Sequence, residues 1–195
     1  TIATEKNIGE ANATTDTEQA DIEVMAMYTK KLSEGYFKSV SDVDNMKYFE
    51  PQLAHKWEDY KDDIDWKNGV YVSPKMDGVR AVINKNGAFS RNGKEFKSIP
   101  HLLEELKNVF TKIPNLILDG EIYTDKLSND FNKIISLAKK TKPASKDLED
   151  SKKYLEYWVF DCPSFDGGFN NRYEKLKELF NKHFKNNKFI KLCEH

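Results

Sequence analysis

The sequence predicts an α+β domain in which antiparallel sheets are flanked by helices. One observation is the Asn86-Gly87 pair between two short apolar runs, because Asn-Gly is a strong signal for a hairpin of antiparallel strands. A second is the helical spacing of apolar residues from Leu102 to Phe110, and a third is the apolar run from Leu116 to Tyr123. A chain of 195 residues is long enough to bury one main core.

The first fifty residues are expected to lie outside that domain. Residues 1–20 are rich in Thr, Ala, Asn and Glu without an apolar period, which predicts a disordered acidic arm. From Asp21 apolar residues recur at helical spacing, so residues 21–50 are expected to form a helical extension whose first helix Gly35 could end. The first 25 residues carry six acids and one lysine, which leaves the rest mildly basic and compatible with a polyanionic partner.

Residues 51–195 are expected to alternate strands with helices. The predicted strands are Val70–Val72, Val79–Asn84, Ala88–Arg91, Leu116–Tyr123, Tyr154–Phe160 and Lys188–Cys193. Ser98 is expected to cap the first helix and Pro114 to end it. Lys126–Lys153 is expected to form a helix and then a mobile loop, either a solvated insertion or a DNA contact, and Asn171–Phe184 an amphipathic helix.

Composition excludes several classes of protein. No apolar run approaches the roughly 18 residues that a membrane span requires, so a soluble protein is expected. Cys162 and Cys193 lack the spacing of a disulfide framework or a zinc knuckle, which favours a reducing, cytosol-like compartment. The four histidines show no metal-binding spacing and are interpreted as structural or surface residues. Because Thr1 is not preceded by a methionine, the chain is expected to be part of a longer protein.

One hexapeptide, Lys75-Met76-Asp77-Gly78-Val79-Arg80, fits the pattern Lys-x-Asp-Gly-x-Arg. The chain has 31 basic residues, and only Arg80, Arg91 and Arg172 are arginines. A guanidinium offers phosphates and sugar hydroxyls a planar fork that a lysine ammonium cannot copy. Arg80 and Arg91 are therefore interpreted as ligand contacts, and Arg172 as half of a surface ion pair.

Several motifs occur in a fixed order around this hexapeptide. They are Pro51-Gln52-Leu53-Ala54, Ser73-Pro74-Lys75, Ser90-Arg91-Asn92-Gly93, Leu118-Asp119-Gly120-Glu121 and Tyr157-Trp158-Val159-Phe160-Asp161. In this order they resemble the motifs of the covalent nucleotidyltransferases, which comprise ATP-dependent DNA ligases, RNA ligases and messenger-RNA capping enzymes. The likeness to small phage and viral DNA ligases is the greatest. It implies an ATP-grasp-like adenylation domain over residues 51–195, with its C-terminal part missing.

The resemblance also implies a reaction. Neutral Lys75 would attack the α-phosphorus of ATP and hold AMP, which then passes to the 5′-phosphate of nicked duplex DNA before the nick is sealed. It implies that Ser73 lies beside the adenine edge, Arg80 and Glu121 hold the ribose hydroxyls, Phe160 stacks on adenine and Arg91 binds the nick phosphate. Mg²⁺ is implied beside the triphosphate, although no residue is assigned as a metal ligand. A monomer in the cytoplasm, or in the host cytoplasm for a phage protein, is expected.

Two family motifs are not found at the place where the family has them, a metal-binding Glu-Gly motif and a Lys-x-Lys motif. Lys140-Thr141-Lys142 has the second pattern but comes before the expected stacking strand. The resemblance therefore implies that these 195 residues alone do not adenylylate themselves. An RNA ligase and a GTP-using capping enzyme stay open, since they share the lysine motif. A nucleotide- or DNA-binding module that has lost the chemistry also stays open, as does a generic domain in which the motifs are accidental.

Overall fold

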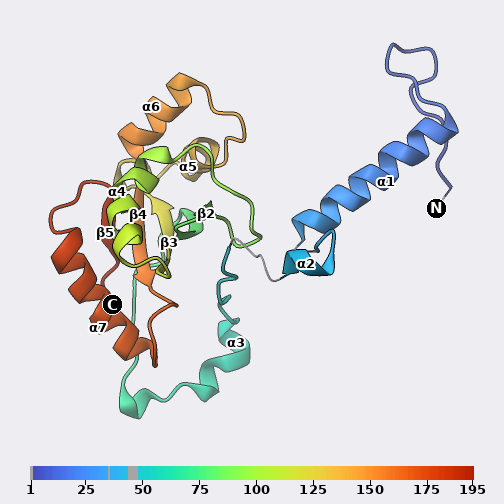
Figure 1. Cartoon of the computed structure of the whole chain (residues 1–195). Coiled ribbons are helices and arrows are strands. Elements are labelled where there is room, and N and C mark those ends of the chain that lie inside the picture. Colours follow the sequence, from blue (N-terminus) through green and yellow to red (C-terminus); the bar gives the residue numbers. More distant parts are fainter. Residues whose placement is uncertain (1, 35, 44–47) are drawn as a thin grey trace. The chain divides into compact units, whose positions relative to one another are not determined.

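A computed structural model describes residues 2–34, 36–43 and 48–195 (Figure 1). The chain divides into two compact units, Thr1–Met46 and Lys47–His195, and each is described by itself. No helix within the described ranges is both long and apolar enough to cross a membrane.

The first unit contains α1 (Asp16–Ser33) and α2 (Val40–Val43). α1 begins at Asp16 rather than at the expected Asp21, because Thr15 and Glu18 form a capping box. The Glu18 amide donates to the Thr15 hydroxyl at 3.3 Å, and the Thr15 amide donates to the Glu18 carboxylate at 2.9 Å. Lys6 and Thr14 also form an antiparallel bridge, which the composition of residues 1–20 does not indicate. The predicted helix end at Gly35 lies outside the described residues.

The second unit is built on a five-stranded sheet with the order β2-β1-β3-β4-β5. The strands are β1 (Val79–Asn84), β2 (Gly87–Phe89), β3 (Ile117–Tyr123), β4 (Glu156–Asp161) and β5 (Ile190–Leu192). Neighbouring strands are antiparallel except β4 and β5, which are parallel. The predicted α+β class and the Asn86-Gly87 hairpin are confirmed.

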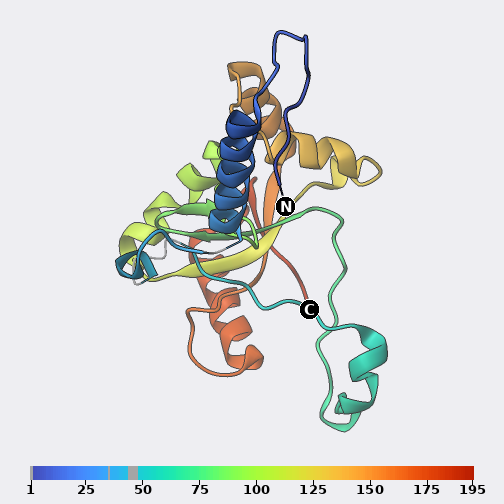
Figure 2. The ribbon, with the colours of Figure 1, turned by 90° about the vertical axis from the view of Figure 1, so that its right-hand side faces the viewer.

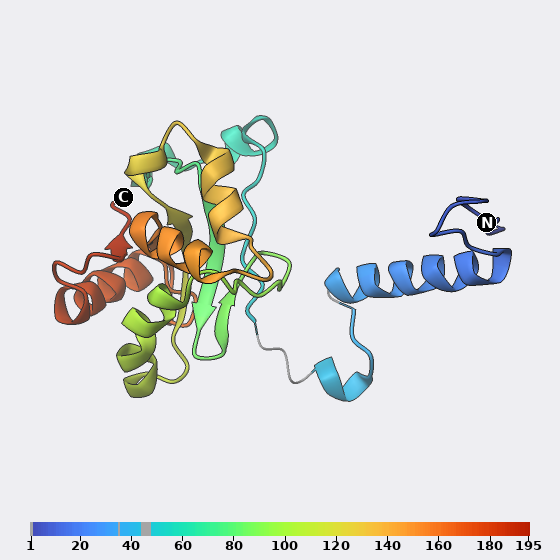
Figure 3. The same cartoon turned by 90° about the horizontal axis from the view of Figure 1, so that it is seen from above.

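Helices flank this sheet (Figure 1). They are α4 (Pro100–Lys112), α5 (Phe131–Ala138), α6 (Ser145–Tyr154) and α7 (Phe169–His183), and α6 lies beside α5 (Figure 3). A single core joins their apolar faces to alternate residues of the strands. The short helix α3 (Trp57–Tyr60) and the 3-10 turns η1 (Lys61–Asp63) and η2 (Trp66–Asn68), drawn in teal, project away from this body (Figure 2). A third 3-10 turn, η3 (Asp125–Leu127), follows β3.

The two faces of the sheet differ in chemistry because successive side chains of a strand point to opposite sides. Core-facing side chains are Val79, Ala81 and Ile83 on β1, Leu118 and Ile122 on β3, and Tyr157 and Val159 on β4. The Tyr157 hydroxyl lies 3.0 Å from the Ala81 carbonyl and 2.9 Å from the Leu118 carbonyl, so it ties the three strands together inside the core. On the other face Arg80, Asp119, Glu121 and Trp158 carry polar or aromatic side chains, whereas Val82 is aliphatic and buried.

The predicted strand Val70–Val72 is wrong, since these residues form no strand in the described structure. β1 pairs with β3 along its whole length and with β2 through residues 82–84, and residues 70–72 pair with neither strand. The segment between η2 and β1 runs outside the sheet, and Tyr71 packs against aromatic rings instead.

Two further local predictions are wrong. The Ser98 hydroxyl does not cap α4 but donates to the Ala138 carbonyl at 2.6 Å, and α4 begins at Pro100, whose ring suits a first helical turn. The predicted mobile loop after α5 contains a second helix, α6. Asp147 accepts from the Ala144 amide at 3.0 Å at the start of α6 and pairs with Lys140 at 3.0 Å.

Candidate functional site

A row of functional groups crosses the polar face of the sheet. Arg80 on β1 is the register partner of Glu121 on β3, and Glu121 is the partner of Trp158 on β4. The register of β3 and β4 shifts between Asp119 and Gly120, which leaves Phe160 at the irregularity. Bulges of this kind re-aim a side chain and are common beside active sites. Three residues that the sequence analysis selected, Arg80, Glu121 and Phe160, therefore share one face.

Arg80 is fixed on three sides. Its Nε and Nη2 donate to the two oxygens of Asp119 at 3.0 and 2.6 Å. Its Nη1 donates to the Gln52 carbonyl at 2.7 Å, which ties the segment before α3 to the sheet. Its guanidinium carbon also lies 5.4 Å from the centre of the Phe160 ring, within cation–π range. Arg80 thus links a buried carboxylate, a backbone segment and an aromatic ring.

The electrostatics of this face centre on two carboxylates. Burial raises the pKa of Glu121 to about 7, although the positive charges of Arg80 and Lys75 and the Gly78 amide oppose that shift. Burial likewise raises the pKa of Asp119, and the hydrogen bonds and charge of Arg80 oppose it. The hydrogen bonds from Arg80 to Asp119 raise the pKa of the Arg80 guanidinium, so Arg80 stays charged. The site combines a fixed cation with a carboxyl group that titrates near neutral pH.

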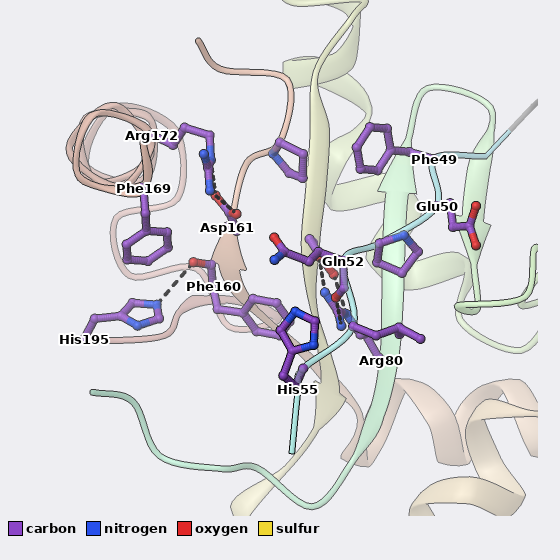
Figure 4. A pocket seen from close by; sticks show the side chains of 15 residues that line it. Phe49, Glu50, Gln52, His55, Arg80, Phe160, Asp161, Phe169, Arg172 and His195 are labelled. Atoms are coloured by element: carbon purple, nitrogen blue, oxygen red, sulfur yellow. Dashed lines mark hydrogen bonds and ion pairs between the residues drawn. The ribbon is translucent and has the colours of Figure 1, made fainter. Parts of the chain in front are cut away.

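A pocket of about 760 Å³ opens on this face (Figure 4). Its floor includes Arg80, Asp119 and Phe160, and residues 49–55 form one wall. The opposite wall includes His195 and the N-terminal part of α7. A volume of this size lies in the range of small-ligand sites.

The second wall of the pocket is held by two interactions. Arg172 Nε and Nη2 each lie 2.9 Å from an oxygen of Asp161, which confirms the predicted ion pair of Arg172. His195 Nε2 lies 3.2 Å from the Phe160 carbonyl, so the stacking candidate is fixed through its backbone.

The pocket is also lined by several residues to which the sequence motifs assigned no role, although Gln52, Asp119 and Asp161 stand within those motifs. These residues are Gln52, His55, Asp119, Asp161 and His195. Strand alternation offered a signal for Asp119, since it must share a face with Glu121. The histidines had no such signal, because His55 and His195 reach the pocket through tertiary packing.

The remaining predicted site residues, Glu121 among them, lie outside the lining of this pocket. Lys75 and Ser73 are exposed in the segment that leads from η2 into β1, although the charge of Lys75 acts on Glu121. Arg91 is exposed in a turn after β2, in which the Gly93 amide donates to the Ser90 carbonyl at 2.9 Å. Lys75 therefore lies near enough to Glu121 to lower its pKa without lining the pocket, and Arg91 belongs to a separate surface loop.

No metal centre is evident in the described part of the chain. Among those residues no group of three or more His, Cys, Asp and Glu side chains could hold a metal ion. Asp119 cannot serve readily as a ligand, because Arg80 occupies both of its oxygens.

A family model described as "ATP dependent DNA ligase domain" matches residues 51–195. A DNA ligase of African swine fever virus is 29% identical over 167 residues, which cover 80% of this chain and 36% of that protein. A DNA ligase of Haemophilus influenzae is 27% identical over 115 residues, which cover 59% of this chain and 37% of that protein. The chain thus spans little more than a third of these relatives.

Solved structures share the fold of the second unit. A structure named Pmar-Lig_Pre is similar with a TM-score of 0.51 and 24% identity, over 73% of this chain and 34% of that chain. Another, named Pmar-Lig_PreS3, is similar with a TM-score of 0.51 and 23% identity over the same shares.

Proposed function

This chain belongs to the family of ATP-dependent DNA ligases, and we propose that the protein that contains it seals nicks in duplex DNA through a lysine–AMP intermediate. The observation that carries the proposal is the placement of Lys75 in the segment that leads into β1, whose Arg80 faces Glu121 and Phe160 on the open face of the sheet. The motif order of the sequence and the geometry of the site support the same chemistry.

In the proposed reaction Lys75 is the nucleophile. Its neutral Nζ attacks the α-phosphorus of ATP, a phosphorus–nitrogen bond forms, and the bond to the bridging oxygen breaks as pyrophosphate leaves with the electron pair. The amine loses a proton in this step. An oxygen of the DNA 5′-phosphate then attacks the same phosphorus and releases the lysine. A DNA 3′-hydroxyl finally attacks the 5′-phosphate, and AMP leaves as the nick closes.

The nucleotide would lie along the polar face. We assign Phe160 to stack on adenine, Ser73 to the adenine edge, and Arg80 with Glu121 to the ribose hydroxyls. Three of the five Arg80 N–H groups are engaged by Asp119 and Gln52, so Arg80 would offer the sugar its remaining donors in a fixed orientation. A donor that is already oriented loses little entropy on binding.

Mg²⁺ is proposed from the family chemistry alone. The described residues offer no cluster of ligands that fits the ion, and no step above depends on a protein–metal bond. ATP phosphates can themselves carry the ion, as in many phosphoryl-transfer sites.

The family favours a DNA partner, and the rival readings of an RNA ligase or a capping enzyme are not favoured. We place Arg91 on the DNA 5′-phosphate, since an exposed guanidinium on a tight turn suits a phosphate contact. We also propose that the protein is a monomer and acts in the cytoplasm.

The test measures the transfer of labelled AMP from ATP to the protein and then to DNA. The complete protein is incubated with ATP labelled at the α-phosphate, and covalent label is measured on a denaturing gel before and after addition of nicked duplex DNA. Wild type is expected to gain label and then lose it to DNA as the nick closes. Lys75→Ala should carry no label, whereas Lys85→Ala, which removes another exposed lysine, should label normally.

Parallel reactions with GTP and with nicked RNA test the rival enzymes. Equal labelling of wild type and Lys75→Ala would refute the assignment of Lys75 as the nucleophile. Labelling by GTP but not by ATP would favour a capping enzyme. An unlabelled wild-type protein that still binds nicked DNA would favour a binding module.

A further inference from the structure

Four aromatic rings from three parts of the second unit meet at one wall of the pocket, and two of them, Phe169 and His195, line it. We call Tyr71, Phe169, Tyr173 and His195 the ring cluster. Tyr71 lies in the segment before β1, Phe169 and Tyr173 lie in the first turns of α7, and His195 follows β5. The ring centre of Tyr71 lies 4.9 Å from that of Phe169, 6.1 Å from Tyr173 and 6.3 Å from His195, all in edge-to-face geometry.

The other three rings contact one another, and Tyr71 packs against them. Phe169 stacks on Tyr173 at 5.7 Å, and His195 lies 4.7 Å from Tyr173 and 5.0 Å from Phe169. The Tyr173 hydroxyl donates to the Cys193 carbonyl at 3.1 Å, and His195 Nε2 contacts the Phe160 carbonyl at 3.2 Å. The ring cluster is therefore joined to the strand that carries the proposed adenine-stacking residue.

The segment that carries Lys75 is held at its two ends. At its start the ring cluster holds Tyr71. At its end Gly78 lies so close to β3 that an added Cβ would meet the Ile122 carbonyl, the Glu121 Cγ at 2.8 Å and the Tyr123 Cβ at 3.2 Å. Between these points residues 72–75 are exposed and form no strand, so no ladder of backbone hydrogen bonds fixes their path. The position of the Lys75 amine thus depends on the two anchors.

We propose that Tyr71 is a positioning residue for Lys75: its ring in the cluster sets where the nucleophile segment runs relative to the nucleotide. This inference rests on the proposed function, since it concerns the same lysine. Tyr71 does not line the pocket, so its loss should leave most nucleotide contacts in place. A misplacement of a reacting group by about 1 Å can cost on the order of a hundredfold in rate.

The test compares variants of the complete protein in single-turnover formation of labelled lysine–AMP, with the ATP concentration varied. Tyr71→Ala is expected to lower the rate at saturating ATP by about tenfold to a hundredfold, while the half-saturating ATP concentration changes by less than about threefold. Tyr71→Phe keeps the ring and should restore the rate to within about twofold. Phe169→Ala removes a partner ring, so the double variant should lose less than the product of the single losses.

The matched control is Tyr28→Ala. Tyr28 is 45% exposed against 46% for Tyr71, but it lies on α1 in the other unit. Its removal should leave the rate unchanged. Circular dichroism and the melting temperature show whether Tyr71→Ala is folded, and Tyr71→Leu serves if it is not.

The outcomes separate this proposal from the proposed function. If wild type forms no lysine–AMP, the proposed function fails. If wild type labels on Lys75 and the folded Tyr71 variant labels at the wild-type rate, the positioning role of Tyr71 is overturned while the nucleophile stands. A rise in the half-saturating ATP concentration without a change in the rate at saturating ATP also overturns it, because that result would mean that Tyr71 contributes to nucleotide binding instead.

Discussion

Arg80 and Asp119 form a two-pronged ion pair across β1 and β3, although they are not register partners. Asp119 is paired with Val82, and Glu121 with Arg80. Arg80 reaches the Asp119 carboxylate diagonally across the two strands. Its Nε lies 3.0 Å from Oδ1 of Asp119, and its Nη2 lies 2.6 Å from Oδ2. Because the bidentate hydrogen bonds of Arg80 go to Asp119, they do not go to the carboxylate of Glu121, which lies directly opposite Arg80. The sheet thus separates a structural carboxylate from one that can meet a ligand.

Asp119→Asn should destabilise the protein, because it leaves a partly buried guanidinium without its charge partner. The Asp119 side chain is 5% exposed and that of Arg80 is 26% exposed, so we expect a loss of about 2 to 3 kcal/mol in the free energy of unfolding. Urea unfolding measures it. The control is Glu174→Gln in the exposed pair with Lys177, which should cost less than about 1 kcal/mol. Equal losses in the two variants would contradict the prediction.

Stability should fall between about pH 4.5 and pH 7 because of Glu121. Burial raises the pKa of Glu121 to about 7, so the folded protein keeps a proton that the unfolded chain releases near its ordinary pKa. The stabilising contribution is fully present below about pH 4.5 and is lost as the pH rises through 7. Glu121→Gln should therefore gain stability relative to wild type, on the order of 3 kcal/mol, between pH 4.5 and pH 8. A pH-independent difference in urea unfolding would rule this out.

Gly120→Ala should disrupt the sheet. A Cβ at Gly120 would meet the Trp158 carbonyl, the Tyr157 ring at 2.8 Å and the Val159 Cα at 2.9 Å. Since two of these are backbone atoms, β3 and β4 would have to separate, and we expect a loss of more than about 2 kcal/mol. Gly168→Ala is the control, because Gly168 has φ −67° and open space around its Cβ position. Its effect on the urea midpoint should stay within about 1 kcal/mol.

Arg91→Ala should separate DNA binding from adenylylation. Arg91 is exposed on a surface turn and does not line the pocket, so lysine–AMP formation should stay unchanged while transfer of AMP to nicked DNA weakens. The slope of log Kd for nicked DNA against log salt should fall by about 1 in magnitude. Lys94→Ala removes a neighbouring positive charge that is an ammonium and not a planar guanidinium. It should slow AMP transfer less than Arg91→Ala does. An equal loss in both variants would reduce Arg91 to one charge among several.

The sequence predicted the strands around the site well, because their signals are local. Asn86-Gly87 fixes the hairpin of β1 and β2, and apolar residues mark β3 and β4. The prediction failed for Val70–Val72, which have strand propensity but pair with no strand of the sheet. It also failed at Ser98, whose hydroxyl is used by the Ala138 carbonyl far along the chain. Both errors arise because a local pattern does not show which partner a residue will find.

By itself the sequence indicated the family to which this chain belongs. The order of the motifs that contain Lys75, Arg80, Glu121 and Phe160 gave the resemblance, because each motif is a short run of residues that can be recognised locally along the chain. The tertiary structure decided which groups act together. It paired Arg80 with Asp119 rather than Glu121, brought His195 to Phe160, and set Tyr71 among the rings of α7. Strand register and helix packing join residues that are distant in the chain, and no local pattern encodes those distances.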